Sequence, residues 1–323
     1  MVIDVDDFDN KTVVKVVGVG GSGISAINCM LDAGMQDIEF IAVDTDKNAL
    51  SQSLSSVCIP LTRKFDGELG SVVDADSDSV ISARGAEEQR EEILGALDNA
   101  DMVFIVAGMG GGTTTSAVPI VAKCAKEVGA LTVAIVTRPF SYEGRKCFKY
   151  AEVGIEKLRQ HVDTIITISN DRVLETLDKS TSSTDVFKEV DSIICQGVQS
   201  ISDFVSDYSY VNLDFDDIKT AISNAGSAFI CMGEASGDNA PEVALSNAVN
   251  SVLLEKPICG ARSIVISFSG APHHLNMMEL YEATQSIVSQ VHPEANILWG
   301  VSVNDTLEET IRVIAITTNF ESM

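Results

Sequence analysis

The sequence alternates short apolar segments with segments of helical periodicity, and this alternation constrains the fold most. The apolar segments are "VVKVVGV" (13–19), "IEFIAV" (38–43), "MVFIVA" (102–107), "LTVAIV" (131–136) and "TIITI" (164–168). Each is short and rich in β-branched residues, as expected for parallel strands buried on both faces. Helical segments such as "SAINCMLDAG" lie between them, so the sequence predicts βαβ units in a doubly wound α/β domain.

Apolar positions after Ser183 recur every three or four residues, which predicts one long central helix over 183–207. The apolar stripe expected to be buried along it comprises Val186, Phe187, Val190, Ile193, Ile194, Val198, Ile201 and Val205. Beyond the helix, "SAFICMG", "SIVISF", "NILWGVSV" and "IRVIAITT" predict strands, with helices near 240–255 and 276–291. The expected domains are therefore an α/β domain at 1–182, the central helix, and a smaller α+β domain at 208–323.

Charge and composition exclude several classes of partner. The 47 acidic and 22 basic residues give a formal net charge of -25, whereas binding to DNA or RNA needs Lys and Arg to displace counterions. No nucleic-acid partner is therefore expected. The chain has no run of roughly 18 apolar residues and begins with an acidic segment, so we expect a cytoplasmic protein without direct membrane binding. The seven cysteines form no C-x-x-C pair, which predicts reduced thiols and no metal site.

Two glycine-rich loops each follow a predicted strand and precede a predicted helix: "GVGGSG" at 18–23 and "GMGGGTTTSA" at 108–117. Glycine lets the backbone approach a ligand closely, and a helix start presents free N–H groups with a partial positive charge. Each loop therefore predicts a phosphate-type anion site. A tight turn with a threonine cap explains the second loop equally well when that loop is taken alone.

The first loop also matches a dinucleotide-binding fingerprint, because Asp44 ends the next strand about twenty residues later, where a ribose-binding acid is expected. An NAD-dependent oxidoreductase is thus one hypothesis. Such an enzyme does not need the second loop, whereas a nucleoside triphosphate needs several loops around its phosphates. A P-loop is excluded, because G-x-x-x-x-G-K-[ST] does not occur in the sequence.

The ordered motifs of the chain resemble those of FtsZ, a prokaryotic relative of tubulin whose subunits stack head to tail around GTP into cell-division filaments. The matching segments are "DMVFIVAGMGGGT", "GALTVAIVTRPFSYEGRK", "HVDTIITISNDRVL", "QGVQSISD" and "VNLDFDDIKTAISNAGSA". They extend over nearly the whole chain. The resemblance implies the tubulin/FtsZ fold and a polymerising protein that binds GTP or GDP, with Mg²⁺ as a further expected ion. It implies a GTPase if the pocket is competent.

The resemblance also implies roles for particular residues. The phosphates would lie in a cradle of Gly20, Gly21, Gly23, Gly110, Gly111, Gly112 and Thr113. Glu143 would reach the ribose, Asn170 the ribose or base, and Phe187 would lie against guanine. The next subunit would supply Asn212, Asp214 and Asp217 from "NLDFDD", with carboxylates that orient the attacking water. Taken alone, the hexapeptide is better explained as a solvated turn with an aspartate cap before a helix.

The chain departs from the family pattern inside the pocket. Asp74, Asp76 and Asp78 in "DADSDS" stand where the family has a glycine-rich loop for the γ-phosphate. Three carboxylates beside a triphosphate repel it, so we expect either an intervening cation or a solvated acidic loop. Thr114 and Ser116 replace glycines, which adds side chains where phosphate would approach.

Three further departures concern the sugar and base. Cys147 replaces an arginine and Ser25 an asparagine, while Ser192 takes the place of the aspartate that pairs with guanine, with Asp191 as its neighbour. Asp191 is the remaining candidate for base recognition, although adjacent helix positions point about 100 degrees apart. A serine cannot accept two guanine N–H bonds, so the departures together predict weaker and less selective nucleotide binding.

Two functional hypotheses remain strong on this evidence. One is a filament protein of cell division that binds and hydrolyses GTP between subunits, with further copies of the chain as its partners. The other is a non-hydrolysing or nucleotide-free FtsZ paralogue with a structural or regulatory role, which offers its acids to a second FtsZ protein in mixed filaments. Because "TTNFESM" ends the sequence, no adaptor-binding tail is expected.

Overall fold

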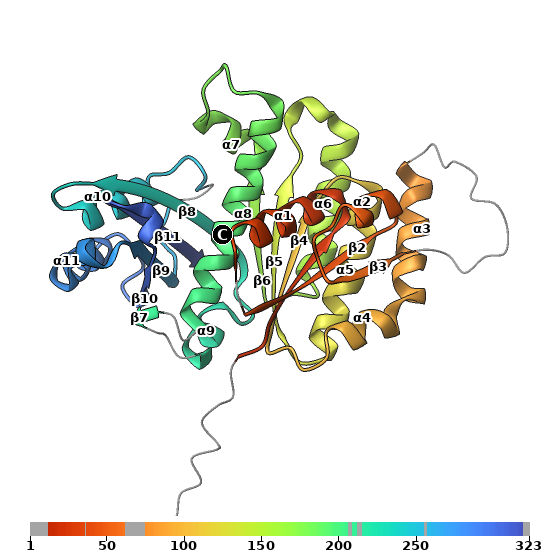
Figure 1. Cartoon of the computed structure of the whole chain (residues 1–323), viewed down its shortest axis with the longest axis horizontal. Helices are drawn as coiled ribbons and strands as arrows, with labels where there is room; N and C mark the ends of the chain where they lie inside the picture. Colours follow the sequence, from red (N-terminus) through yellow and green to blue (C-terminus); the bar gives the residue numbers. More distant parts are fainter. Residues whose placement is uncertain are drawn as a thin grey trace, which may run out of the picture.

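The computed structural model describes residues 12–35, 37–61, 75–205, 209–211, 215–254 and 257–318. Within these ranges the backbone forms one eleven-stranded sheet in the order β3-β2-β1-β4-β5-β6-β8-β11-β9-β10-β7. Figure 1 shows the N-terminal strands on the right, the C-terminal strands on the left and a long helix between them.

The N-terminal half of the sheet is parallel, as the apolar segments predict. Its strands are β1 (Val14–Val19), β2 (Ile38–Asp44), β3 (Val57–Pro60), β4 (Met102–Gly108), β5 (Leu131–Arg138) and β6 (Thr164–Ser169). All but β3 coincide with an apolar segment of the sequence. The edge strand β3 was not predicted, because it has only four residues, two of them exposed, and so gives a shorter apolar run than the other strands.

Helices cover both faces of these strands, which confirms the doubly wound arrangement. They are α1 (Gly20–Asp32), α2 (Lys47–Ser51), α3 (Ala75–Glu88), α4 (Arg90–Ala96), α5 (Gly112–Glu127), α6 (Arg145–Arg159) and α7 (Asn170–Thr176), with a 3-10 turn, η2 (Ser141–Glu143). One core cluster joins α1 and the central helix to one face of the sheet, and a second joins α4, α5 and α6 to the other face.

The acidic segment at 74–79 is only in part the loop that the sequence predicts. Residues 75–79 form the start of α3, which continues to Glu88. Acidic residues and serine are favoured in the first turn of a helix, where N–H groups lack partners, and this preference explains the helical start. Asp74 lies outside the described residues, as do the side chains of Asp76 and Asp78.

The central helix α8 (Ser183–Val205) agrees closely with its predicted limits. Val186, Val190, Ile193, Ile194, Val198 and Ile201 are buried as predicted. Phe187 was wrongly included in this stripe, since its side chain is 50% exposed. The error arose because an apolar ring at helical spacing predicts core packing just as well as it predicts a wall for a ligand.

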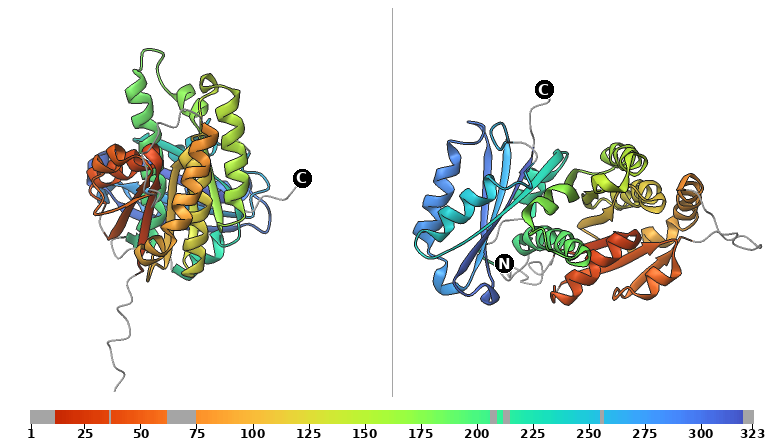
Figure 2. Two further views of the ribbon diagram at one scale, coloured as in Figure 1. Left: turned by 90° about the vertical axis from the view of Figure 1, so that its right-hand side faces the viewer. Right: turned by 90° about the horizontal axis from the view of Figure 1, so that it is seen from above.

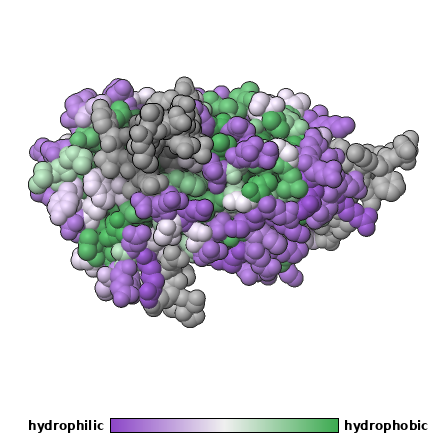
Figure 3. Space-filling model, turned by 90° about the horizontal axis from the view of Figure 1, so that it is seen from below, coloured by the Kyte–Doolittle hydropathy of each residue, from purple (hydrophilic) through white to green (hydrophobic). Residues whose placement is uncertain are grey.

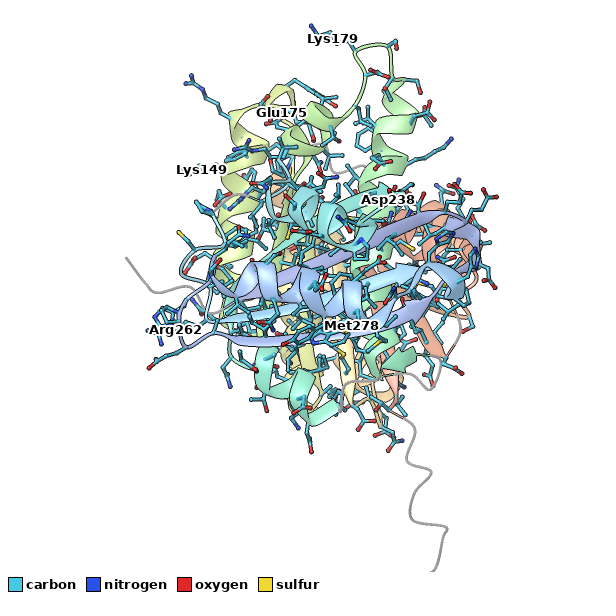
Figure 4. The ribbon with its side chains drawn as sticks, turned by 90° about the vertical axis from the view of Figure 1, so that its left-hand side faces the viewer. Lys149, Glu175, Lys179, Asp238, Arg262 and Met278 are labelled. Carbon is cyan, nitrogen blue, oxygen red and sulfur yellow. The ribbon has the colours of Figure 1, made fainter. Side chains whose placement is uncertain are left out.

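The C-terminal part is the expected α+β unit, and its strands continue the same sheet. The strands are β7 (Ser209–Val211), β8 (Gly226–Ser236), β9 (Ser263–Gly270), β10 (Asn296–Val303) and β11 (Thr310–Thr318). The helices are α9 (Phe215–Ile222), α10 (Ala240–Val249) and α11 (Met277–Val288), with 3-10 turns η3 (Pro272–His274) and η4 (Asp305–Leu307). A third core cluster lies beneath α10 and α11, and Met278 labels α11 on the outer side of this sheet in Figure 4.

The two halves of the sheet meet where β6 pairs with β8. Asp163, which precedes β6 and is 2% exposed, accepts hydrogen bonds from Lys126 Nζ at 2.8 Å and from the Thr132 N–H at 2.9 Å. Its carbonyl accepts the Gly226 N–H at 3.0 Å, which ties the start of β8 to the same point. In the part of the chain that the structure describes, none of the helices has the length and apolar character needed to cross a bilayer.

Two glycine substitutions test the packing of these elements. A Cβ at Gly233 of β8 would lie 2.3 Å from the Ala244 carbonyl oxygen in α10, whereas a Cβ at Gly95 in α4 would meet nothing within 4 Å. We expect Gly233→Ala to lower the free energy of unfolding by about 2 kcal/mol or more, because two backbones must separate. Gly95→Ala is the matched control and raises it by up to about 1 kcal/mol. Thermal melting of both variants checks this, and an unaltered Gly233→Ala protein contradicts the packing.

Candidate functional site

A cleft of about 370 Å³ lies at the carboxyl ends of the parallel strands, where doubly wound sheets bind ligands. It brings together most of the residues that the sequence predicted. These are Gly20, Gly21, Asp44, Gly110, Gly111, Gly112, Thr113, Glu143, Asn170 and Phe187. Gly23 and Asp191 do not line it, and Asn212 and Asp214 lie outside the described residues.

The middle of the cleft is formed by the starts of α1 and α5. Neither N-cap residue, Val19 or Gly111, makes a side-chain hydrogen bond to its helix. The N–H groups of both first turns therefore keep their capacity to bind an anion. Gly20 (φ 76°) and Gly110 (φ 111°) adopt backbone angles that other residues rarely accept. A Cβ at Gly110 would also lie 2.6 Å from Cys147 Sγ, so this loop has room only for glycine.

Gly23 serves packing instead of the cradle. A Cβ there would lie 2.5 Å from the Val106 carbonyl oxygen of β4, and a Cβ at Gly18 would lie 2.5 Å from the Gly23 carbonyl oxygen. The third glycine of the fingerprint therefore lets α1 rest directly on the sheet. The sequence pattern could not separate this role from ligand contact, because both require a missing side chain.

The two residues that replace glycines in α5 turn their hydroxyls back to the helix. Ser116 Oγ donates to the Gly112 carbonyl at 2.8 Å, and Ser116 does not line the cleft. Thr114 does line it, but its Oγ1 donates to the Gly111 carbonyl at 3.3 Å and its side chain is buried beside Gly20. The sequence predicted that both side chains would obstruct phosphate. The structure places only Thr114 at the wall, with its polar atom occupied.

One end of the cleft is acidic. Asp44, at the end of β2, is 5% exposed, and burial raises the pKa of its carboxyl group although the Asp46 N–H donates to it at 3.1 Å. Beside it, the hydroxyls of Thr45 and Thr113 are 3.0 Å apart. Thr45 was missed by the sequence analysis, which carried no motif for it. This end presents oxygen atoms, as a site for a hard cation does.

The other end of the cleft is suited to a sugar and a planar ring. Asn170 begins α7 and is 6% exposed, and its Oδ1 is buried without a hydrogen-bond partner among the described residues. Buried polar atoms without partners are rare, so this one points to a ligand. Phe187 stands edge-on to Phe140 with ring centroids 5.5 Å apart. Phe140, which is buried and was not predicted, thus supports the exposed ring from behind.

Glu143 and Cys147 form the wall between these ends. Glu143 Oε1 accepts the Phe140 N–H at 2.8 Å, which fixes the 3-10 turn η2. The Cys147 thiol lies 3.8 Å from Glu143 Oε2 and faces the cleft. Burial first, and the nearby Glu143 carboxylate second, raise the pKa of Cys147. Among the described residues that line the cleft there is no lysine or arginine.

Asp191, not Ser192, faces helix α1 beside the cleft. Asp191 follows Phe187 by four residues and therefore lies on the same face of α8, where the Ser25 hydroxyl donates to its carboxylate at 2.5 Å. Ser192 instead accepts the Gln196 side-chain amide at 2.9 Å. Burial raises the pKa of Asp191 to about 6. The helix therefore retains a carboxylate next to Phe187.

Asp217 lies at the other end of the molecule. It is exposed in the first turn of α9, and the Thr164 hydroxyl at the start of β6 donates to the Ile222 carbonyl at the end of α9. Asn170 follows the far end of β6, about 20 Å away at 3.3 Å per residue. Asp217 and the cleft of the same chain are thus on opposite faces. Figure 3 shows the face that carries α9, where hydrophilic areas alternate with apolar ones.

Comparison with known proteins agrees with this geometry. The family model described as Tubulin/FtsZ family, GTPase domain, matches residues 13–178, and that described as FtsZ family, C-terminal domain, matches residues 226–321. The chain belongs to the tubulin/FtsZ family. It is an FtsZ-like cytoskeletal protein whose N-terminal part is the GTPase domain of the family. The hypothesis of a dehydrogenase, which rested on the first glycine loop alone, has no support from these matches.

Solved structures give the same family and fold. The FtsZ dimer of M. jannaschii, described as empty, is 34% identical with a TM-score of 0.89, over 97% of this chain and 90% of that one. CetZ from Methanosaeta thermophila is 18% identical with a TM-score of 0.75, over 96% and 87% of the two chains. CetZ2 from Haloferax volcanii, a GTPγS-bound protofilament, is 16% identical with a TM-score of 0.76, over 95% and 93%. The two CetZ proteins share the fold.

A substitution at Asp191 tests the electrostatics of this site. In the folded state the Asp191 carboxyl group holds its proton up to about pH 6, whereas in the unfolded chain it releases the proton near its ordinary pKa of 3.8. The contribution of Asp191 to the free energy of unfolding therefore falls as the pH rises from 4 to 6. Above pH 6 its destabilising effect is complete. Asp191→Asn keeps an acceptor for Ser25 and removes the charge. We expect it to raise the free energy of unfolding at pH 7.5 by about 1 kcal/mol, after solvent screening is allowed for.

Urea denaturation at several pH values checks this expectation. The difference between Asp191→Asn and the unmodified protein shrinks as the pH falls from 7.5 to 5. Ser192→Asn is the matched control on the adjacent position and shows no such pH dependence. A variant that is less stable at pH 7.5, or a difference that does not change with pH, contradicts the assignment.

Proposed function

We propose that the chain binds GTP or GDP in this cleft and polymerises head to tail into cytoplasmic filaments of the cell-division type. The observation that carries the proposal is the order of groups along the cleft. An oxygen-rich acidic end, two uncapped helix starts, and an unpartnered amide oxygen beside an exposed aromatic ring follow one another. A nucleoside triphosphate presents a cation, phosphates, sugar and base in the same order.

The nucleotide would lie with its phosphates over the starts of α1 and α5. Gly20, Gly21 and Gly110 to Thr113 would supply N–H groups to the phosphate oxygens. Glu143 and Asn170 would hold the ribose, and the base would lie on Phe187. Asp191, beside the cleft on the same face of α8 as Phe187, would accept two N–H groups of guanine, a pattern that adenine does not offer. Guanine selectivity would then rest on the contact of α8 with α1.

Mg²⁺ would fit the end of the cleft next to Asp44. The Asp44 carboxylate and the Thr113 hydroxyl line this end of the cleft, and the Thr45 hydroxyl lies 3.0 Å behind that of Thr113. All three are hard oxygen donors, and Mg²⁺ commonly takes one or two carboxylates together with phosphate oxygens. When bound, the ion neutralises the charge on the transferred phosphoryl group. In the described residues no group of three or more His, Cys, Asp or Glu side chains forms a metal site, so the phosphates would have to complete the coordination.

Hydrolysis would require a second copy of the chain. Asp217 lies on the face opposite the cleft, so it reaches a nucleotide only when the face that carries α9 meets the cleft of a neighbour. We assign Asp217, together with Asn212 and Asp214, to the role of orienting the attacking water. Among the described residues that line the cleft, the carboxylates are Asp44 and Glu143, and since Glu143 would hold the ribose, Asp44 is the one left near the phosphates. Turnover would therefore follow assembly.

A second function is favoured by one observation: the cleft has two carboxylates, Asp44 and Glu143, and lacks basic side chains among its described lining residues. Phosphate binding then depends on backbone N–H groups and on a cation alone. If these do not suffice, the chain acts as a structural or regulatory FtsZ paralogue. Its acids would then serve the nucleotide of a second FtsZ protein in a mixed filament.

The thiol of Cys147 provides a direct test of nucleotide binding. Because it faces the cleft, we expect GTP with Mg²⁺ to slow its alkylation by iodoacetamide at least about tenfold, with ATP much less effective. The exposed Cys58 and Cys259 are internal controls whose alkylation does not change. Peptide mass spectrometry reads all three sites. EDTA reduces the protection, because the acidic end then repels the phosphates.

Equal alkylation of Cys147 with and without GTP, at nucleotide concentrations up to the millimolar range, contradicts binding and leaves the paralogue function. Equal protection by GTP and ATP contradicts the role of Asp191 in base recognition. Protection that persists in EDTA contradicts the cation site next to Asp44.

A further inference from the structure

Helices α1 and α8 meet through two matched pairs of polar or sulfur-containing residues. The Ser25 hydroxyl in α1 donates to the Asp191 carboxylate in α8 at 2.5 Å. Cys29 in α1 and Cys195 in α8 form the next pair: each lies four residues further along its helix, and Cys29 packs against the core cluster that contains Cys195. The second pair follows the first by four residues on both helices, so both pairs lie on the sides by which α1 and α8 face each other. Figure 2 shows α8 next to α1 when the molecule is viewed from above.

The two thiols differ in exposure. Cys195 is 4% exposed and its Sγ lies 3.9 Å from Met35 Sδ, whereas Cys29 is only partly buried. Cys29 and Met35 pack against the core cluster to which Cys195 belongs. A reagent from solvent therefore reaches Cys29 first, and Cys195 is held beside it in an apolar, water-poor environment. A reactive thiol with a protected neighbour is the arrangement that favours disulfide formation over further oxidation.

We propose that Cys29 and Cys195 are an oxidation site at which a peroxide forms a disulfide bond between α1 and α8. Disulfides require Cβ atoms about 4 Å apart, and two thiols one turn beyond a direct side-chain contact between packed helices, within one core cluster, approach this geometry. The established contact of Ser25 with Asp191 one turn earlier keeps the helices at close range.

The reaction balances with a peroxide as the only co-reactant. The Cys29 thiolate attacks one oxygen of hydrogen peroxide, the O–O bond breaks, and a sulfenic acid and water are formed. The Cys195 sulfur then attacks the Cys29 sulfur, an S–S bond forms, and the sulfenic oxygen leaves as a second water molecule. Two thiols are oxidised by two electrons, and one peroxide is reduced to two waters.

The electrostatics assign the attacking role to Cys29. The hydrogen bond from Cys195 lowers the pKa of Cys29, although burial and the carboxylates of Asp191 and Asp32 oppose this effect. The same interaction and burial raise the pKa of Cys195. Cys29 therefore carries the larger share of thiolate, and Cys195 acts second.

The bond would join the two helices that hold opposite parts of the cleft. α1 begins at the phosphate cradle and α8 carries Phe187. Oxidation would then fix the position of α8 relative to the cradle and raise the thermal stability of the protein. This consequence for the cleft rests on the proposed function, whereas the formation of the disulfide does not.

The test uses the full chain without nucleotide, treated with hydrogen peroxide and then denatured in excess alkylating reagent. We expect the number of free thiols to fall from the seven in the sequence to five. Digestion under non-reducing conditions yields a linked peptide pair containing Cys29 and Cys195, and dithiothreitol reverses it. Cys29→Ser and Cys195→Ser both abolish the linked peptide pair. Cys195→Ala gives the same result and replaces Cys195→Ser if that variant folds poorly. Cys58→Ser is the matched control and retains it.

Three results would overturn the proposal. In the first, Cys29 and Cys195 both remain open to alkylation after peroxide treatment. In the second, Cys29 is oxidised to sulfinic acid while Cys195 stays a free thiol. In the third, the only disulfides found join separate chains through Cys58 or Cys259. A second readout is the melting temperature, which rises on oxidation in the unmodified protein and in Cys58→Ser but not in Cys29→Ser. No nucleotide is present in this experiment, so a missing disulfide does not count against GTP binding. Equally, a missing protection of Cys147 by GTP does not count against the disulfide.

Discussion

The contact between the backbone of α1 and the backbones of β1 and β4 is the constraint on which the rest of the site depends. Gly18 and Gly23 have no side chains, so α1 rests on the Val106 carbonyl with nothing in between. This contact fixes the start of α1 at the carboxyl end of β1, where its free N–H groups face the cleft. From that position α1 also meets α8 through Ser25 and Asp191. The start of α1 in the cleft and the wall that α8 forms are thus parts of one packing arrangement.

Much of the fold could be predicted, because a strand buried on both faces leaves a continuous apolar run in the sequence. That rule located β1, β2, β4, β5 and β6 and failed for β3, whose edge position leaves it half exposed. It also misplaced Phe187, because periodicity cannot tell a side chain that packs in the core from one that walls a cleft. The start of α3 was missed for a related reason: acidic residues are common both in loops and in first turns of helices.

The site could be predicted as a set of residues but not as a geometry. The glycine loops located the middle of the cleft, yet Gly23 serves packing and the hydroxyl of Ser116 turns back to its own helix. Asp191 and Ser192 are adjacent in sequence, and only their contacts show that Asp191 faces α1. Thr45 and Phe140 support the walls through contacts between distant segments, for which the sequence holds no local signal.

The charge of the cleft unites these observations. An anion site with two carboxylates, and with no basic side chain among the described residues that line it, must use backbone dipoles and a bound cation. Asp217, exposed in the first turn of α9 on the face opposite the cleft, would supply the remaining acid only to a neighbour. Nucleotide chemistry in this protein is therefore expected to depend on assembly, since no single subunit holds all of the groups.

A mixing experiment tests this dependence most directly. Asp217→Asn removes the acid and keeps the cleft, whereas Gly21→Leu blocks the cleft and keeps the acid, at a position where a Cβ meets nothing within 4 Å. Each variant alone is expected to lack GTP turnover. Mixed in equal amounts, they recover about a quarter of the unmodified rate, because about one in four head-to-tail contacts then joins an open cleft to an intact acid. A mixture no more active than its components, or full turnover by Asp217→Asn alone, contradicts a site shared between subunits.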